Sequence, residues 1–362
     1  MPYIMIDGHE DLAYNNLTFG RNYLKSALQT RESEKATIIP ERGGGCMLGF
    51  PEWQKAKVAF IFSTIFAMPK QFQGGDWEKV TYKTANESKI VYQLQFDYYE
   101  RLADENQDKF QIIQNLKQFN NLWDAWNSGV LMEHPIGLIL LMEGAEGLSD
   151  AREISEWYEK GLRIAGPVWA GTKFCGGSHQ PGRFTRDGKL LLEIMADHQM
   201  GLDLSHMTEE SALEALDLYP GVVLASHNTS RSLMNSKHGE RLLTDLTIRR
   251  LIERDGVIGV MPYNYFLVPD WTKTSQRDKV TLNNLVDHID HICQLAGNVD
   301  HVAIGTDFDG TIGFPEVPLE LNSIADMPLL SSVLKLRGYQ EQEIEKIFGF
   351  NWKRLIERIL PA

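Results

Sequence analysis

Residues 201–227 read GLDLSHMTEESALEALDLYPGVVLASH and contain one complete strand–helix–strand unit. Two short apolar runs, Gly201–His206 and Val222–His227, flank the stretch Thr208–Leu218. That stretch opens with a threonine and two glutamates, which is typical of a capped helix with an acidic first turn. Apolar runs without strict alternation suit strands that are buried on both faces of a parallel sheet. Both runs end in a histidine, so the unit also predicts polar chemistry at the strand ends.

The same rhythm extends along the chain and predicts the fold class. Further strands are expected at Tyr3–Asp7, Val58–Phe66, Ile136–Glu143, Leu162–Trp169, Val257–Tyr263 and Val302–Asp307. Further helices are expected at Glu87–Asn106, Gly188–His198, Thr244–Arg254, Asn283–Ala296, Met327–Leu336 and Glu341–Ile359. Eight strands that alternate with helices predict a closed (β/α)8 TIM barrel. An open doubly wound sheet is the alternative, but no G-x-G-x-x-G motif or phosphate-binding loop follows any strand.

We predict one domain over residues 1–362, because such barrels commonly run to about 250 residues and further with insertions. Loop or helix insertions are expected at about residues 29–53 and 71–132, and a helix is expected at the C-terminus. The first insertion, Gln29–Trp53, looks like a loop excursion. The glycine-rich segment Phe174–Asp187 looks like a long connection, and such loops in compact domains tend to be functional.

Composition excludes several classes of protein. The formal net charge is −13 and no basic run occurs, which disfavours binding to nucleic acid. The three cysteines (Cys46, Cys175 and Cys293) are far apart and odd in number, so a disulfide framework is not expected and a cytoplasmic location is. No stretch approaches the roughly 20 apolar residues that a spanning helix needs, so no membrane insertion is expected.

Metal-competent side chains stand where the predicted strands end. They are His9, Asp11, Glu143, His206 and His227. Taken singly, each has an ordinary explanation as a hydrogen-bonded core histidine or a buried ion-pair partner. In a barrel, however, the carboxyl ends of all strands share one face, and active sites lie on that face. Five such groups there make a poor hydrophobic core but a good Zn²⁺ site, so we predict a hydrolase of the metal-dependent type.

The number of these side chains favours two metal ions. One catalytic zinc usually takes three protein ligands, and five become two sets of three if Glu143 bridges them. His9 and Asp11 would then complete one set, and His206 and His227 the other. Metals about 3.5–4 Å apart can share a hydroxide that attacks a carbonyl. Asp307 or Asp309, at the end of the last strand, could move the proton, and Asp307 is favoured because it is nearer the buried strand.

Several short motifs together resemble one known family. They are DGHEDL, MEGAEGL, DLSHMT, ASHNTSRS, MPYNY, GTDFDG and FGFNWKRL. Their order is similar to that in the membrane dipeptidase (renal dipeptidase, peptidase M19) family, and the resemblance runs from Ile4 to about Arg358. It implies a (β/α)8 barrel with two Zn²⁺ ions per chain on the same five ligands, and a tendency to form homodimers. It also implies that Asp307 is the acid/base group, that Arg241 pairs with the carboxylate of a dipeptide, and that Tyr263 faces the substrate.

One position departs from the family pattern. Trp169 stands where members usually carry a histidine that steadies the substrate oxyanion, and loss of one such donor typically lowers turnover about 10²–10³-fold. His179, in the glycine-rich loop, is a candidate replacement, and an ordinary loop histidine is the alternative. We therefore expect a binuclear zinc dipeptidase, with a hydroxide that bridges the metals as the nucleophile. Two alternatives stay open: an amidohydrolase-type enzyme that acts on another small amide or lactone, and a metal-binding member without turnover. His and carboxylate ligands also accept Mn²⁺, Fe²⁺ or Co²⁺.

Overall fold

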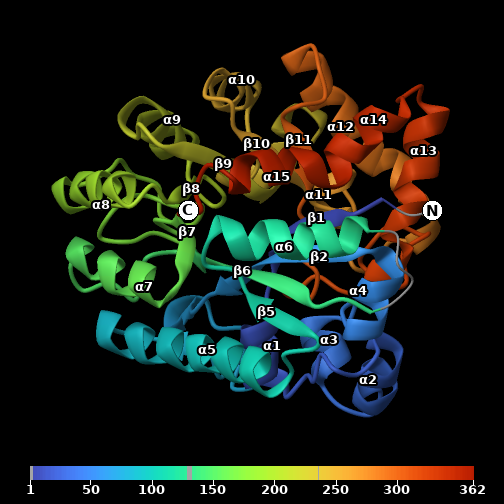
Figure 1. Cartoon of the computed structure of the whole chain (residues 1–362), viewed down its shortest axis with the longest axis horizontal. Coiled ribbons are helices and arrows are strands. Elements are labelled where there is room, and N and C mark those ends of the chain that lie inside the picture. Colours follow the sequence, from blue (N-terminus) through green and yellow to red (C-terminus); the bar gives the residue numbers. More distant parts are fainter. Residues whose placement is uncertain (1–2, 129–132, 235) are drawn as a thin grey trace.

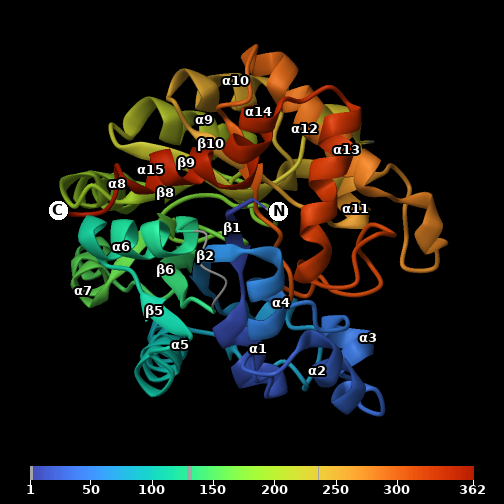
Figure 2. The same cartoon turned by 45° about the vertical axis from the view of Figure 1, so that its right-hand side comes forward.

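The computed structural model describes residues 3–128, 133–234 and 236–362. Eight parallel strands form a nearly closed barrel in the order β1-β2-β6-β7-β8-β9-β10-β11, and helices surround them (Figures 1 and 2). The strands are β1 Met5–Glu10, β2 Val58–Ile65, β6 Ile136–Glu143, β7 Leu162–Gly166, β8 Gly201–Asp203, β9 Val222–Asn228, β10 Val257–Val260 and β11 Val302–Ile304. The ring closes where the backbone N–H of Asp307 donates to the carbonyl of His9 at 3.1 Å. The predicted (β/α)8 TIM barrel is confirmed.

The helices follow the predicted rhythm closely. They are α1 Leu12–Phe19, α2 Ala27–Glu34, α3 Ile39–Gly43, α4 Phe50–Ala56, α5 Ala85–Glu105, α6 Leu116–Asn127, α7 Ile154–Lys160, α8 Arg186–Asp197, α9 Glu209–Leu218, α10 Asp245–Glu253, α11 Asn264–Leu267, α12 Leu282–Ala296, α13 Leu330–Leu336, α14 Glu341–Glu345 and α15 Asn351–Ile356. The hydroxyls of Thr208 and Thr244 accept the backbone N–H groups of Ser211 and Thr247, as expected of N-cap residues. A π-helical turn, Lys346–Phe350, joins α14 to α15. Among the described residues, no helix is both long and apolar enough to cross a bilayer.

The first predicted insertion is not a loop excursion. Residues 29–53 lie largely in α2, α3 and α4. Local signals start these helices: Ser26 and Gln29 form a capping box at α2, and a proline stands in the first turn of both α3 and α4. The second insertion carries β4 Thr81–Tyr82, α5, β5 Phe110–Ile112 and α6, and β5 adds to the sheet beside β6. Its last residues, 129–132, lie outside the described residues.

Four strands are shorter than the sequence predicts, and this shapes the site. β7, β8, β10 and β11 each end three residues before the predicted end, so Trp169, His206, Tyr263 and Asp307 stand in the loops that follow. His206 and Asp307 have positive φ angles of 67° and 56°. Non-glycine residues adopt this left-handed region at a cost, and such positions cluster at functional sites. The chain therefore leaves the sheet early and turns these side chains toward the barrel mouth.

The barrel interior is narrow around β9. A Cβ atom at Gly259 or Gly305 would lie 2.0 or 1.9 Å from the carbonyl oxygen of Ser226, so only glycine allows the backbones of β9, β10 and the end of β11 to come this close. The indole N–H of Trp352 in α15 donates to the carbonyl of Ile304, the last residue of β11, at 2.8 Å. This close packing holds Ser226 and the adjacent His227 near the barrel axis.

Candidate metal centre and substrate pocket

Six ionisable side chains converge at the carboxyl ends of the barrel strands. They are His9 in β1 and Asp11 just after it, Glu143 at the end of β6, His206 after β8, His227 in β9, and Asp307 after β11. All six side chains are buried. Residues almost three hundred positions apart in the sequence are therefore brought together on one face, as the strand-end pattern predicts for a barrel. Their role as metal ligands stays a prediction.

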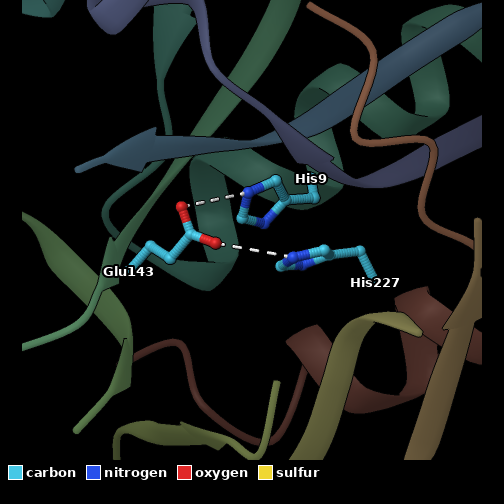
Figure 3. A group of neighbouring side chains, drawn as sticks. All are labelled: His9, Glu143 and His227. Carbon is cyan, nitrogen blue, oxygen red and sulfur yellow. Dashed lines mark ion pairs between the residues drawn. The ribbon is translucent and has the colours of Figure 1, made fainter. Parts of the chain in front are cut away.

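Glu143 faces both His9 and His227 and forms an ion pair with each (Figure 3). Its Oε1 is 2.9 Å from Nε2 of His206 and 3.4 Å from Nε2 of His227. Its other oxygen, Oε2, is 3.6 Å from Nε2 of His9. The two oxygens of one carboxylate therefore face two different sets of imidazoles, which is the geometry that a bridging ligand needs.

The donor atoms suit divalent cations. Nε2 of His9 is 3.7 Å from Asp11 and 3.9 Å from Asp307, and it has no hydrogen-bond partner within the described part of the chain. Ligand atoms of His9, Glu143 and His227, and likewise of His9, Asp11 and Asp307, lie within 4.8 Å of one another. Because a buried polar atom without a partner costs free energy, and imidazole nitrogen and carboxylate oxygen are typical zinc ligands, these residues fit a metal centre.

The electrostatics of the centre are strongly perturbed. Burial favours the neutral form of His9, but the carboxylates of Glu143 and Asp11 outweigh it and raise the pKa of this imidazole. Burial raises the pKa of Glu143, but the charge of His9 and the hydrogen bond from His206 reverse this and lower it. Burial and the charge of Arg241 lower the pKa of His206 to about 4. A cation would therefore compete with a proton chiefly at His9, since a ligand imidazole must be neutral.

Ser226 and Asp203 orient two of the imidazoles. The Ser226 hydroxyl donates to Asp203 at 2.5 Å and lies 2.8 Å from Nδ1 of His227 and 3.3 Å from Nδ1 of His9. A hydroxyl has one proton, so while it donates to Asp203 it can only accept from the two rings. Both imidazoles then carry their proton on Nδ1, which leaves both Nε2 lone pairs directed into the centre. Partners of this kind commonly fix the tautomer of metal-binding histidines.

The structure separates the two aspartates that end the last strand. Asp307 lies 3.8 Å from Nε2 of His227 and lines the central cavity. Asp309 points away and is fully buried, where it pairs with Arg21 at 3.2 Å and accepts the backbone N–H of Met47 at 2.8 Å. Tyr23 also donates to it at 3.1 Å. Asp309 therefore anchors the loop, and Asp307 is the one available to the cavity.

A cavity of about 370 Å³ opens above this centre, lined by Arg241, Tyr263, Trp169 and His179 among others. Nη2 of Arg241 donates to the carbonyl of His227 at 3.2 Å, whereas its buried Nη1 has no partner within the described ranges. Tyr263 donates to Glu316 at 3.3 Å. His179 stacks on Trp169, with ring centroids 4.9 Å apart, and burial together with the charge of Arg241 lowers its pKa. His179 therefore stays neutral more readily than a free imidazole does.

Comparison with known proteins identifies the family. The model of the membrane dipeptidase family, peptidase M19, matches residues 2–360. The chain belongs to this family. It is 29% identical over 235 residues to an uncharacterized protein in the pqqA 5′ region of Klebsiella pneumoniae, covering 62% of this chain and 82% of that one. It is 33% identical over 195 residues to dipeptidase ataJ of Aspergillus terreus, covering 52% of this chain and 45% of that one.

Solved structures share the fold of this M19 chain. A metallo peptidase from Rhodobacter sphaeroides, solved with a phosphinate mimic of the dipeptide L-Ala-D-Ala, superposes with a TM-score of 0.80 at 21% identity and covers 99% of this chain and 100% of its own. The family is one of metallo-dipeptidases, so this member is a peptide-bond hydrolase and is expected to use a divalent metal. The aligned segment spans less than half of dipeptidase ataJ.

Several pocket residues were not predicted from the sequence of this M19 member. Phe66 and Met68 line the cavity after β2, and Tyr14 lines it from α1. Phe66 ends a predicted strand, and this position indicates a place near the barrel mouth. Apolar residues at strand ends are common in a hydrophobic core, however, so the sequence did not single it out. Ser226 and Asp203 stood in the strand-end motifs, yet their link to the imidazoles depends on contacts between strands.

Proposed function

We propose that this protein is a binuclear zinc dipeptidase that hydrolyses the amide bond of dipeptides. One observation carries the proposal: three imidazoles and three carboxylates converge below a cavity whose wall holds a partly buried arginine. The carboxylates provide negative charge for cations, and the arginine provides positive charge for the carboxylate of a small peptide. A cavity of about 370 Å³ is in the range of a small-molecule site.

We assign the ligands by the two faces of Glu143. His9 and Asp11 would hold one cation together with Glu143, and His206 and His227 would hold the other. The distances of 3.6 Å from His9 and 2.9 Å from His206 to separate oxygens support this division. When bound, such cations would polarise the amide carbonyl and activate a water.

Asp307 and Arg241 act on the substrate itself. Burial raises the pKa of Asp307 well above its usual value, so this carboxyl holds a proton more readily than an exposed aspartate does. It can therefore take a proton from the attacking water and deliver it to the leaving amine. Arg241 has a buried Nη1 that is free to donate within the described chain, and it binds the free carboxylate through charge-assisted hydrogen bonds.

The experiment measures metal content and turnover together. Elemental analysis of the zinc-loaded protein should give close to two ions per chain, and the loaded protein should cleave some Xaa-Yaa or Xaa-D-Yaa dipeptide. Asp307→Asn should abolish cleavage and keep the metal content. Loss of one metal ion in Asp307→Asn would instead make Asp307 a ligand, as its position near His9 and Asp11 also allows. A protein that takes up no divalent metal would refute the proposal.

Trp169 supports a second candidate on the same site. The side chain in the loop after β7 is an indole, which has one neutral N–H donor and cannot act as a cationic donor to an oxyanion. The same centre could then act on another small amide or lactone, or bind metal without turnover. Measuring hydrolysis of N-acyl amino acids and lactones beside dipeptides separates these functions. Full zinc occupancy without any hydrolysis would indicate a protein that binds metal without turnover.

Three further proposals follow from the sequence. Zinc is preferred over Mn²⁺, Fe²⁺ and Co²⁺ as the native metal, and elemental analysis of protein from its natural host would decide this. A homodimer is expected, which light scattering of the purified chain measures. A cytoplasmic location is expected, which fractionation of the host cell measures.

A further inference from the structure

An aromatic wall forms one side of the cavity. The rings of Phe66 and Trp169 are 5.3 Å apart, and His179 stacks on the other side of Trp169 at 4.9 Å with an interplanar angle of 23°. The sulfur-containing side chain of Met68 lines the same region. Trp169 is also 5.6 Å from His206, so the wall reaches the edge of the candidate metal centre. We call Phe66, Met68, Trp169 and His179 the aromatic wall.

The part of the aromatic wall formed by Phe66 and Met68 lies across the barrel from Arg241. Phe66 and Met68 follow β2, whereas Arg241 follows β9. In the strand order of the barrel, β2 and β9 are four steps apart in either direction, so they lie on opposite sides of the mouth. Trp169 follows β7, between them, and its loop leans toward Phe66. Glu143, at the end of β6, lies between the guanidinium side and the aromatic side.

This layout orients a dipeptide. With its carboxylate at Arg241, a dipeptide has its amide near Glu143, and its N-terminal residue extends toward the opposite side. The surface that this residue meets consists of aromatic rings and an apolar side chain. In its neutral form, His179 adds no charge to that surface. Aromatic rings prefer offset or edge-to-face contact with other rings, and thioethers also pack well on rings.

We propose that the aromatic wall is a subsite for an aromatic or large apolar side chain on the N-terminal residue of the substrate. The inference rests on the proposed function, because it takes the same centre and the same pairing with Arg241. It adds the substrate class: dipeptides of the type Phe-Xaa, Tyr-Xaa or Leu-Xaa over Gly-Xaa. Trp169 is the specificity-determining residue, since it contacts both Phe66 and His179.

The test compares kcat/KM for Phe-Ala, Leu-Ala, Ala-Ala, Gly-Ala and the reversed peptide Ala-Phe with the zinc-loaded protein. Burial of an aromatic side chain should favour Phe-Ala over Gly-Ala by roughly 10- to 100-fold. Trp169→Ala should reduce this ratio by about tenfold, and Trp169→Phe should retain most of it. Tyr265→Ala, which removes a ring from the side of the pocket near Tyr263, is the matched control and should leave the ratio unchanged.

Each outcome has a distinct meaning. Equal cleavage of Phe-Ala and Gly-Ala, or a preference for Ala-Phe over Phe-Ala, overturns the subsite and leaves the proposed function standing. If no dipeptide is cleaved, the proposed function fails, and the subsite is judged by calorimetric binding of phosphinate analogues of Phe-Ala and Gly-Ala. Tighter binding of the Phe analogue that is lost in Trp169→Ala supports the subsite, and equal binding of the two analogues overturns it.

Discussion

Replacing Ser226 with alanine removes a hydroxyl that two imidazoles of the candidate metal centre share. The hydroxyl lies 2.8 Å from Nδ1 of His227 and 3.3 Å from Nδ1 of His9, and its proton goes to Asp203. Without it, neither ring has this partner to keep its proton on Nδ1, so both rings can rotate or change tautomer. We therefore expect Ser226→Ala to weaken metal binding although Ser226 is not itself a proposed ligand.

The magnitude follows from the contacts. Loss of an outer partner of a metal-binding histidine typically weakens metal binding 10–100-fold, and here one substitution affects two rings, so we expect the upper part of that range. This corresponds to about 2–3 kcal/mol in binding free energy. Asp203 keeps the backbone N–H donors of Ser205 and Ser226, at 3.0 and 2.9 Å, so the fold should tolerate the change.

The assay is competition for Zn²⁺ between the apo-protein and a chromophoric chelator. Ser226→Thr, which keeps a hydroxyl, should restore most of the affinity. Ser205→Ala is the matched control, because the Ser205 hydroxyl lies 3.3 Å from Ser226 and contacts the backbone of His227 but neither imidazole. If Ser226→Ala binds zinc as tightly as Ser205→Ala does, the hydroxyl does not orient the rings and the reasoning is wrong.

Three further predictions concern stability. Asp309→Ala removes one of the two buried carboxylates that pair with Arg21, the other being Glu34, and leaves the backbone N–H of Met47 without its acceptor. It should cost about 2–3 kcal/mol in urea unfolding while zinc stoichiometry is unchanged; a loss below 1 kcal/mol would contradict the anchoring role. Burial lowers the pKa of His288 to about 4, so the unfolded chain takes up this proton first and stability should fall as pH drops from about 6.5 toward 4. The loss of stability that this group causes is up to about 3 kcal/mol. The free energy of unfolding of His288→Gln and of the parent is measured at pH 7 and 4.5 with a chelator present. His288→Gln should lose less stability between the two pH values than the parent does, and equal losses would argue against this role of His288. Removing bound metal with a chelator should lower the melting temperature reversibly, since a ligand at 100 times its Kd stabilises the fold by about 2.7 kcal/mol; an unchanged melting temperature would show that no metal is bound.

Local patterns were enough to predict the strands and most helices of this chain. Buried parallel strands need continuous apolar runs, which can be recognised in the sequence. Capping residues such as Thr208 and Thr244 mark the N-termini of amphipathic helices. The segment Gln29–Trp53 was interpreted wrongly because its glycines suggested a loop. The capping box at Ser26 and Gln29 lies at its start and begins helix α2, so a local signal for a helix was present in the sequence.

The strand ends were harder to predict from the sequence. The predicted runs continue past β7, β8, β10 and β11 with residues such as Val168, Leu204 and Met261, so the sequence suggests longer strands, whereas the structure ends each of them three residues earlier. After β8 and β11, His206 and Asp307 adopt left-handed backbone conformations that a sheet cannot include. Such conformations are imposed by the surrounding packing, and no residue type in the sequence announces them. After β7 and β10, Pro167 and Pro262 lack the backbone N–H that a sheet needs.

By itself the sequence determined the barrel and the positions of His9, Asp11, Glu143, His206 and His227 at its strand ends, because apolar runs and the polar residues that end them are local properties of the chain. Tertiary structure alone decided which carboxylate faces the cavity, Asp307 or Asp309, and how Ser226 reaches two imidazoles from separate strands. It also decided that Phe66 and Trp169 form one wall of the cavity. These are contacts between distant segments, and their geometry depends on barrel closure and loop packing, which no local pattern encodes.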